Sequence, residues 1–457
     1  MSHQDNYSTL EVDTSAELPQ VKPTDNPPQA LPKDALPEVA APSEAKSRSA
    51  EAATICGLRK AIFWASVITA ALVVIGISVG VGVGVSVTRH RNSNAGNNSI
   101  TQDNISGRPA PFSRISASNY TDKQGLEHVH VYFQDSCLNI WMADREVRKD
   151  EWDLSPVNTT GMAPRKGTPI AAFDSVDRMN TDFHLDFSSS NNKIRNIWAA
   201  DRGSSAWEIA SAPDDTWEIT ENSGLAAYDT QCYTYCEDQN EACFNCTIIT
   251  IYVFQSPVRD NQTAVAYPYN NAVYFGTYLP DGVGPDDGTS YALVPIQPIA
   301  TLGDKEPNVA LYLSAQGRLS ELFFAKNNRP QWKDSNLNLN MSIPTGSQIA
   351  AMSYTQNSLR YGQVILTKED GGVMMAYLDG FPANDWTSVT SVDGMENVIA
   401  LSPITATQSG QVYALERDED RVHIVEFNRT SVTGMLTGMP TFERLGPIKI
   451  PESTTPC

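Results

Sequence analysis

The sequence predicts an all-β fold, a six-bladed β-propeller, preceded by a disordered tail and a single transmembrane helix. Three observations predict it. A pattern of short strands recurs six times after residue 110, residues 61–88 contain no charged side chain, and residues 1–54 are rich in proline and poor in aromatic side chains. We therefore divide the chain into a disordered cytosolic tail (1–54), a transmembrane helix (61–88), a polar stalk (89–110) and a six-bladed propeller (111–457).

The repeat opens with a strand of small side chains. The six copies are ISASNY at Ile115, IAAFDS at Ile170, LAAYDT at Leu225, IATLG at Ile299, IAAMSY at Ile349 and VIALSP at Val398. Small side chains suit the strand nearest the crowded axis of a propeller. One interval, from Leu225 to Ile299, is longer than the others because it contains the stretch CYTYCEDQNEACFNC, which we interpret as an insertion.

Two alternating strands follow each opening strand, as period-2 hydrophobicity predicts. The second strands read HVHVYFQ, DFHLDFS, IITIYVF, NVALYLS, GQVILT and GQVYAL, and the third strands include NIWMADR, NIWAADR, RLSELFF, VMMAYLD and RVHIVEF. In four repeats a turn then ends in tryptophan, at Trp152, Trp207, Trp332 and Trp386. Four short strands in each repeat, without a helical period, indicate a propeller blade.

The heptapeptides that begin at Asn139 and Asn196 differ at one position. We interpret them as the same third strand in blades one and two. Ile140 and Ile197 are expected on one face of the strand and the two tryptophans on the other, and we attribute both heptapeptides to core packing rather than to binding.

The uncharged stretch AIFWASVITAALVVIGISVGVGVGVSVT, residues 61–88, is long enough to cross a bilayer, for which ~20 apolar residues suffice. A single spanning segment must be helical because lipid offers its backbone no hydrogen-bond partners. Gly76, Gly80 and Gly84 are spaced by four and predict a groove for helix pairing, so a homodimer is one alternative to a monomeric anchor.

Glycosylation acceptors orient the anchor. Eight Asn-x-Ser/Thr sites follow it, and one, at Asn6, precedes it. The eight are Asn97, Asn104, Asn119, Asn158, Asn245, Asn261, Asn340 and Asn428. They predict a type II single-pass glycoprotein with a cytosolic N-terminus and a lumenal or extracellular propeller.

Cysteine usage agrees with this orientation. Cys56 is alone on the cytosolic side, and six cysteines lie beyond the membrane, an even number that suits disulfides. Cys137 and Cys457 are candidates for a bridge that closes the ring. Four more lie close together, at Cys232, Cys236, Cys243 and Cys246. A tetrahedral zinc site is the alternative for these four, but oxidised pairs are expected, with no metal and no cofactor.

The propeller repeat resembles that of the fungal fucose-specific lectins, of which this chain would be a membrane-anchored, divergent member. FSRISASNYTDKQGLEHVHVYFQD and GRLSELFF carry the resemblance. It implies that each sugar lies between adjacent blades. An arginine that opens the second strand and a glutamate on the third strand bond its hydroxyl groups, and aromatic rings of the next blade stack on its apolar face.

The two positions were carried over blade by blade, except in blade three, whose insertion prevents alignment. The arginine position falls on His130, His184, Ala310, Gln363 and Gln411, and the glutamate position falls on Asn139, Asn196, Glu321, Met375 and Ile424. No aligned blade keeps both partners. The candidate carbohydrate-binding residues are therefore Glu321 with Trp386, His130 with Asn139 and Trp207, and His184 with Asn196. The alternative for Glu321 is an ordinary exposed strand glutamate.

These observations predict a carbohydrate-binding protein whose degenerate inter-blade sites take a fucose-related glycan or glycoprotein. The alternative is a propeller without sugar sites that acts as a protein-interaction module at the cell surface or in the secretory pathway. A net charge of −20 argues against a nucleic-acid partner. We do not expect an enzyme, because the chain has no nucleophile elbow, zincin helix or phosphate loop, and SAPDDTW at Ser211 lacks the glycine of a sialidase Asp-box.

Overall fold

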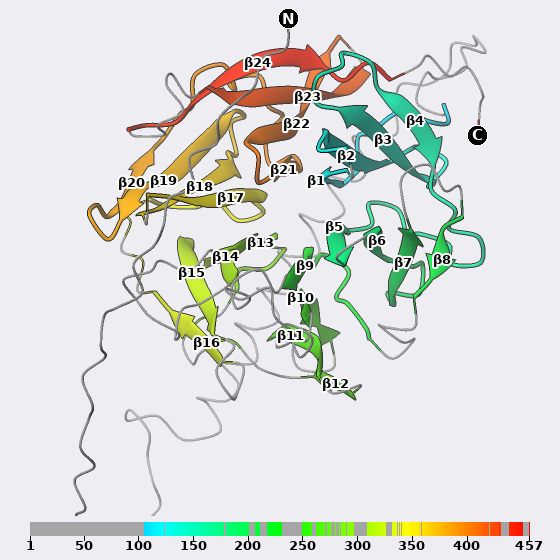
Figure 1. The fold of residues 1–457 in the computed structure, drawn as a ribbon, viewed down its shortest axis with the longest axis horizontal. Coiled ribbons are helices and arrows are strands. Elements are labelled where there is room, and N and C mark those ends of the chain that lie inside the picture. Colours follow the sequence, from blue (N-terminus) through cyan, green and yellow to red (C-terminus); the bar gives the residue numbers. More distant parts are fainter. Residues whose placement is uncertain are drawn as a thin grey trace, which may run out of the picture. The chain divides into compact units, whose positions relative to one another are not determined.

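The computed structural model of the chain contains a ring of six four-stranded antiparallel sheets (Figure 1). The predicted all-β, six-bladed propeller is confirmed. The structure describes residues 105–122, 124–177, 180–200, 206–210, 217–230, 249–257, 262–269, 272–275, 279, 283, 285–288, 290–296, 309–325, 331–335, 337, 339, 341–357, 359–419, 421–430, 438–450 and 457.

The predicted tail, the predicted anchor and all but the end of the predicted stalk lie outside the described residues. Within the described ranges, no helix is long and apolar enough to span a membrane. The anchor, its orientation and its pairing through Gly76, Gly80 and Gly84 therefore stay predictions.

Each blade is a meander of four consecutive strands. Blades one to three contain β1 (Ile115–Thr121), β2 (Glu127–Gln134), β3 (Ile140–Glu146), β4 (Asp153–Pro156), β5 (Ile170–Asp177), β6 (Asn180–Ser188), β7 (Ile194–Ala200), β8 (Glu208–Ile209), β9 (Leu225–Thr230), β10 (Ile249–Ser256), β11 (Gln262–Tyr269) and β12 (Ala272–Phe275). Blades four to six contain β13 (Tyr291–Pro295), β14 (Val309–Ala315), β15 (Arg318–Ala325), β16 (Gln331–Asp334), β17 (Ile349–Gln356), β18 (Leu359–Thr367), β19 (Val373–Phe381), β20 (Trp386–Val389), β21 (Ile404–Ala406), β22 (Gln411–Asp418), β23 (Arg421–Thr430) and β24 (Thr441–Pro447).

Two of the predicted opening strands were wrong. Blade four opens with β13, which begins at Tyr291, and not at Ile299, which lies outside the described residues. Blade six opens with β21, which begins at Ile404, and Val398 forms only an isolated bridge with Glu416. The error in blade six came from choosing a short run of small residues that has only an isolated bridge partner. Figure 1 shows the six opening strands nearest the centre of the ring.

The hydrophobic core lies between blades rather than within them. Six clusters of buried residues fill the six gaps between neighbouring sheets, and each gap is here called a seam and named by its two blades. The tryptophans at the start of the fourth strands pack backwards onto the preceding blade. Trp207 packs in seam 1/2, Trp332 in seam 3/4, Trp386 in seam 4/5 and Trp152 in seam 6/1.

Side-chain packing and one covalent bond close the ring. Blade one uses only β1 to β4 and blade six only β21 to β24, so no sheet is shared between the two chain ends. A disulfide joins Cys137, in the turn between β2 and β3, to Cys457. This pairing confirms the expectation for the two cysteines and ties the end of the chain to blade one.

The twin heptapeptides are not equivalent in the structure. Ile140 pairs with Gln134 and Ile194 pairs with Ser188 at corresponding places in blades one and two. Ile197 lies three residues beyond Ile194, and a shift by an odd number moves a side chain to the other face of a strand. Ile140 and Ile197 therefore enter seam 1/2 from opposite sides, and the prediction that they share a strand face was wrong. Core packing, as expected for them, is what they provide.

Candidate binding sites between the blades

Seam 4/5 contains a buried polar cluster around Glu321. The side chain comes from β15 and is 2% exposed. Its Oε1 accepts hydrogen bonds from the Tyr312 hydroxyl at 2.7 Å and from Arg360 Nη2 at 2.8 Å. Arg360 comes from β18 of the next blade and also donates to the Tyr312 oxygen at 2.7 Å. Glu321 is thus a buried, paired carboxylate, and the alternative of an exposed strand glutamate was wrong.

Aromatic rings enclose this cluster. Trp386, which is half-buried, meets Tyr312 edge to face at 5.8 Å between ring centroids. The Arg360 guanidinium lies 5.2 Å from the centroid of the Phe323 ring. Burial opposes the charge on Arg360, but Tyr312 and Glu321 outweigh it and raise the pKa of the guanidinium. The sequence therefore placed Glu321 and Trp386 in one seam correctly.

Seam 6/1 contains a second cluster of the same four residue types. Glu426, from β23, is 3% exposed and forms an ion pair with Arg145 from β3 of blade one. The Tyr413 hydroxyl donates to the same carboxylate oxygen at 3.2 Å. Trp152 lies edge to face with Tyr413, and the Arg145 guanidinium lies 4.7 Å from the Trp152 ring centroid. Burial raises the pKa of Glu426, and Arg145 only partly offsets it.

Each of the two seam arginines has a nitrogen that donates no hydrogen bond to the described part of the chain. Nε of Arg145 and Nε of Arg360 are buried and have no hydrogen-bond partner among the described residues. Buried polar groups in proteins are normally satisfied, and each unsatisfied one requires an explanation. Both seams therefore offer a charged hydrogen-bond donor beside an aromatic ring.

Sequence reasoning missed Glu426 because it counted from the start of each third strand. Tyr312 pairs with Glu321 and Tyr413 pairs with Glu426, so the two glutamates are equivalent. The hairpin of blade six extends two residues further than that of blade four, which moved the expected position to Ile424. The available signal was the isolated glutamate within HIVEF, an apolar run.

The predicted pair of His130 and Asn139 does not form. Met142, not Asn139, occupies the glutamate position of blade one, because it lies opposite Tyr132. Asn139 is exposed just before β3, and its backbone and side-chain N–H groups both donate to Asp135.

His130 has a different set of neighbours. It is 1% exposed, its Nε2 lies 3.5 Å from Asp144, and its ring meets Phe183 of blade two edge to face at 4.7 Å. Trp207 reaches the same seam but contacts the Tyr132 ring, at 6.3 Å between centroids. Seam 1/2 is therefore closed by aromatic packing around the histidine.

The predicted pair of His184 and Asn196 does form, in seam 2/3. Burial lowers the pKa of His184, and a hydrogen bond with the Asn196 side chain partly restores it. Asn196 also donates to Asp186 at 2.8 Å, and the His184 ring stacks on Phe173 at 4.8 Å. Burial raises the pKa of Asp186, which Asn196 partly offsets. His184, Asn196 and Asp186 thus form a largely buried hydrogen-bonded network.

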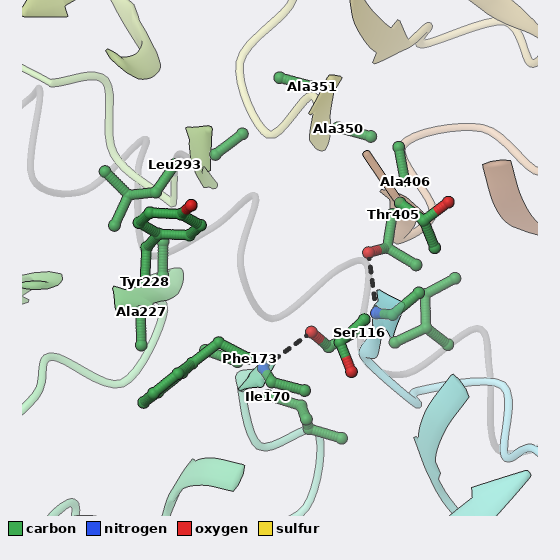
Figure 2. A pocket seen from close by; sticks show the side chains of 18 of the residues that line it. Ser116, Ile170, Phe173, Ala227, Tyr228, Leu293, Ala350, Ala351, Thr405 and Ala406 are labelled. Carbon is green, nitrogen blue, oxygen red and sulfur yellow. Dashed lines mark hydrogen bonds between the residues drawn. The ribbon is translucent and has the colours of Figure 1, made fainter. Parts of the chain in front are cut away.

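A cavity of about 450 Å³ lies on the axis and is lined by the opening strands, as their small side chains predict. Figure 2 shows the hydroxyl groups of Ser116 and Thr405 at its wall, each bonded to the backbone of a neighbouring opening strand. Ser116 Oγ accepts from the backbone N–H of Ala172, and Thr405 Oγ1 accepts from that of Ala117, each at 3.0 Å. These polar groups link adjacent opening strands, so we assign the cavity to ring assembly rather than to recognition.

The predicted glycosylation acceptors within the described residues differ in exposure. Asn158 is exposed, and Asn428 is half-buried on β23. Asn119 lines the axial cavity, where its Oδ1 accepts from Gln408 N. The other acceptors, the four close cysteines and most of the SAPDDTW stretch lie outside the described residues. In the part of the chain that the structure describes, no three His, Cys, Asp or Glu side chains are placed to hold a metal ion.

Comparison with solved structures finds fungal lectins. A point mutant of the Aleuria aurantia lectin in complex with alpha-methyl-L-fucoside matches with a TM-score of 0.54 and 16% identity, over 73% of this chain and 97% of that chain. AofleA from Arthrobotrys oligospora matches with a TM-score of 0.53 and 16% identity, over 74% and 88%. SapL1 lectin in complex with alpha methyl fucoside matches with a TM-score of 0.53 and 15% identity, over 76% and 99%. At these identities the likeness shows the fold. No family model and no curated protein matches the chain.

Proposed function

We propose that the propeller is a carbohydrate-binding module that takes a fucose-related glycan or glycoprotein at the seams between its blades. One observation carries the proposal. Seams 4/5 and 6/1 independently hold the same set of groups, a glutamate on the third strand, a tyrosine on the second strand, and an arginine and a tryptophan from the next blade. The structural neighbours that contain a fucoside support the ligand class.

The chemistry of this set suits a sugar. Charged planar groups form stronger hydrogen bonds than neutral ones and fix the direction of a hydroxyl group. An aromatic ring covers the apolar face of a pyranose with little loss of conformational freedom. The free Nε donors of Arg145 and Arg360 supply the hydrogen bond that a ligand hydroxyl would accept.

Seam 4/5 is the more accessible of the two. Trp386 is half-buried, whereas Trp152 is 6% exposed. A sugar reaches Arg360 only if the Trp386 side chain moves outward, since Glu321 and Arg360 are both almost fully buried. Binding in seam 4/5 therefore requires a rotamer change of one tryptophan.

The test uses the full-length protein in detergent micelles on a glycan array, followed by calorimetry with the best neutral glycan. Trp386→Ala and Glu321→Gln are expected to abolish binding at seam 4/5. Trp207→Ala is the matched control, because Trp207 is also half-buried at the start of a fourth strand but its seam has Met142 in the glutamate position. An array without any bound glycan, from folded protein, would remove the proposal.

Membrane anchorage through residues 61–88, with the propeller in the lumen or outside the cell, is part of the same proposal. Eight acceptor sites after the apolar segment support it. Asn158 is exposed and gives the test. Asn158→Gln is expected to remove one endoglycosidase-sensitive increment of mass, and a chain without any such increment contradicts this orientation.

A second candidate function is a protein-interaction module without sugar sites. The closed state of both Glu–Arg pairs favours it, since Glu321 and Glu426 are 2% and 3% exposed. The test is proximity labelling with free sugars present at about 0.1 M, enough to compete with weak lectin binding. Recovery of one protein partner in undiminished yield would support this function over carbohydrate binding.

A further inference from the structure

Seam 5/6 contains an arginine without a carboxylate partner. Arg429, on β23, is half-buried, and no carboxylate among the described residues lies within ion-pair distance of it. The position that holds a glutamate in seams 4/5 and 6/1 is Met375 here, which lies opposite Ile365. In the described part of the chain, Arg360 and Arg145 each pair with a glutamate, but Arg429 does not, although the net charge of the protein is −20.

Aromatic stacking fixes the orientation of the guanidinium. Its carbon lies 4.5 Å from the centroid of the Tyr354 ring, and Tyr354 in turn stacks on Tyr361 at 5.0 Å with an interplanar angle of 2°. Nη1 donates to Gln363 Oε1 at 2.7 Å and contacts Met352 Sδ at 3.8 Å. One edge of the guanidinium is thus anchored to the protein.

Among the described residues, no hydrogen-bond acceptor contacts the other edge, which Nε and Nη2 form. Gly410 lies beside it with a φ of +104°. A methyl group at Gly410 would lie 3.3 Å from Nε and 3.5 Å from Nη2, so the absence of a side chain keeps this side uncrowded. Two parallel N–H groups on one guanidinium edge match the two oxygens of a carboxylate.

The surrounding groups are neutral or already engaged. Burial raises the pKa of the Tyr354 hydroxyl to about 12, although Arg429 and Gln363 act in the opposite direction. The charge of Asp379 also raises the pKa of Tyr354. Oδ2 of Asp379 accepts a hydrogen bond from the backbone N–H of Gly438 at 2.8 Å. Burial lowers the pKa of Arg429, but a guanidinium stays protonated at physiological pH. Gln363 is almost fully buried and the Tyr354 hydroxyl oxygen is buried, so both groups hold the guanidinium in place beneath its free edge.

We propose that seam 5/6 binds an acidic monosaccharide, with the sugar carboxylate on the free edge of Arg429. This inference rests on the proposed function and names a ligand class for one seam of the ring. A uronic acid carries the required carboxylate and hydroxyl groups on one ring. Seams 4/5 and 6/1 do not favour such a ligand, because their arginines already face glutamate.

The experiment compares methyl β-D-glucuronide with methyl β-D-glucoside, which differ only by carboxylate against hydroxymethyl. Calorimetry with the full-length protein in detergent is expected to show glucuronide binding at least about tenfold tighter, as one charge-assisted pair provides. Arg429→Gln is expected to remove the preference. Arg421→Gln is the control, because it loses the same charge from the exposed start of the same strand.

Arg429→Lys separates charge from geometry. It keeps the cation but loses the fork, so a several-fold weaker glucuronide affinity is expected. Equal binding of both glycosides to a folded protein, or acetate that competes as well as glucuronide, overturns this inference and leaves neutral sugar binding at the other seams intact. If no saccharide binds while the protein unfolds cooperatively, the proposed function fails with it.

Discussion

Arg145 and Arg429 occupy the same position in two blades, yet they have opposite surroundings. Ala143 pairs with Val131 and Phe427 pairs with Val412 at corresponding places, and each arginine follows two residues later. Each side chain points into the seam with the preceding blade. Arg145 meets Glu426 in seam 6/1, whereas Arg429 meets Gln363 and the ring of Tyr354 in seam 5/6.

The difference shows that the preceding blade decides what a seam arginine does. Paired with a buried carboxylate, the guanidinium holds two sheets together and closes the ring. Opposite an amide and a thioether, the same group keeps a free edge for an anion. The two seams differ at one position of the preceding blade, which holds Glu426 in seam 6/1 and Met375 in seam 5/6. The glutamate makes the arginine a structural contact, and the methionine leaves it as a candidate binding site.

The largest expected effect comes from removing the glutamate of the closed seam. Glu426→Leu leaves Arg145 buried without its carboxylate partner, and an uncompensated buried charge typically costs about 3–5 kcal/mol. Urea denaturation of the variant should show a loss of that size. The double variant with Arg145→Met should recover most of it, because an apolar pair replaces an ion pair at little net cost. Equal stability of Glu426→Leu and the unchanged protein would show that the pair does not hold this seam.

Converting the open seam into a closed one is the second test. Met375→Glu places a carboxylate at the position that Glu426 holds in blade six, opposite Arg429. A double-mutant cycle with Arg429→Met should give a favourable coupling of about 1–3 kcal/mol, as for contacting partners, and glucuronide binding should be lost. A coupling near zero would mean that the two seams differ in backbone geometry as well as in composition.

Asp174 is a seam carboxylate without an arginine among its described neighbours, the opposite of Arg429. Ser118 donates a hydrogen bond to it, and His130 lies close enough to affect its pKa. Burial raises its pKa from 3.8 to about 6, against the opposing effects of these neighbours. Between these values the folded state holds a proton that the unfolded chain has released, so stability should fall as pH rises from about 4 to 6. The expected amplitude is on the order of 1–2 kcal/mol, allowing for the partial exposure of the side chain.

Asp174→Asn should remove this fall, because its amide does not titrate, and should gain stability relative to the unchanged protein above pH 6. Thermal unfolding of both proteins from pH 4 to 8 measures it, and the difference between the two curves removes the pH dependence that both proteins share. Parallel pH curves would contradict the assignment.

The smallest effect is expected at Arg429. Arg429→Gln should change the free energy of unfolding by no more than about 1 kcal/mol, the size of a partly exposed cation–π contact. Urea denaturation alongside Arg421→Gln measures it. A loss as large as that of Glu426→Leu would show that Arg429 is a structural group, and its edge would no longer be a candidate for ligand binding.

The sequence by itself determined the number of blades, most strands and the bridge between Cys137 and Cys457. Period-2 hydrophobicity and small residues at the axis repeat along the chain, and such local signals survive without knowledge of neighbours. It also placed Glu321 and Trp386 in one seam, because both lie at fixed steps from recognisable strands.

Only the tertiary structure decided the partners of the seam arginines and the register of the twin heptapeptides. Both faces of a propeller blade are buried, so alternation between apolar and polar residues does not reveal which face a side chain takes. Hairpin lengths shift the register, as they did between Ile424 and Glu426. A seam is built from two repeats roughly 50 residues apart, and the pairing of Glu321 with Arg360 or of Arg429 with Gln363 exists only once the blades stand side by side.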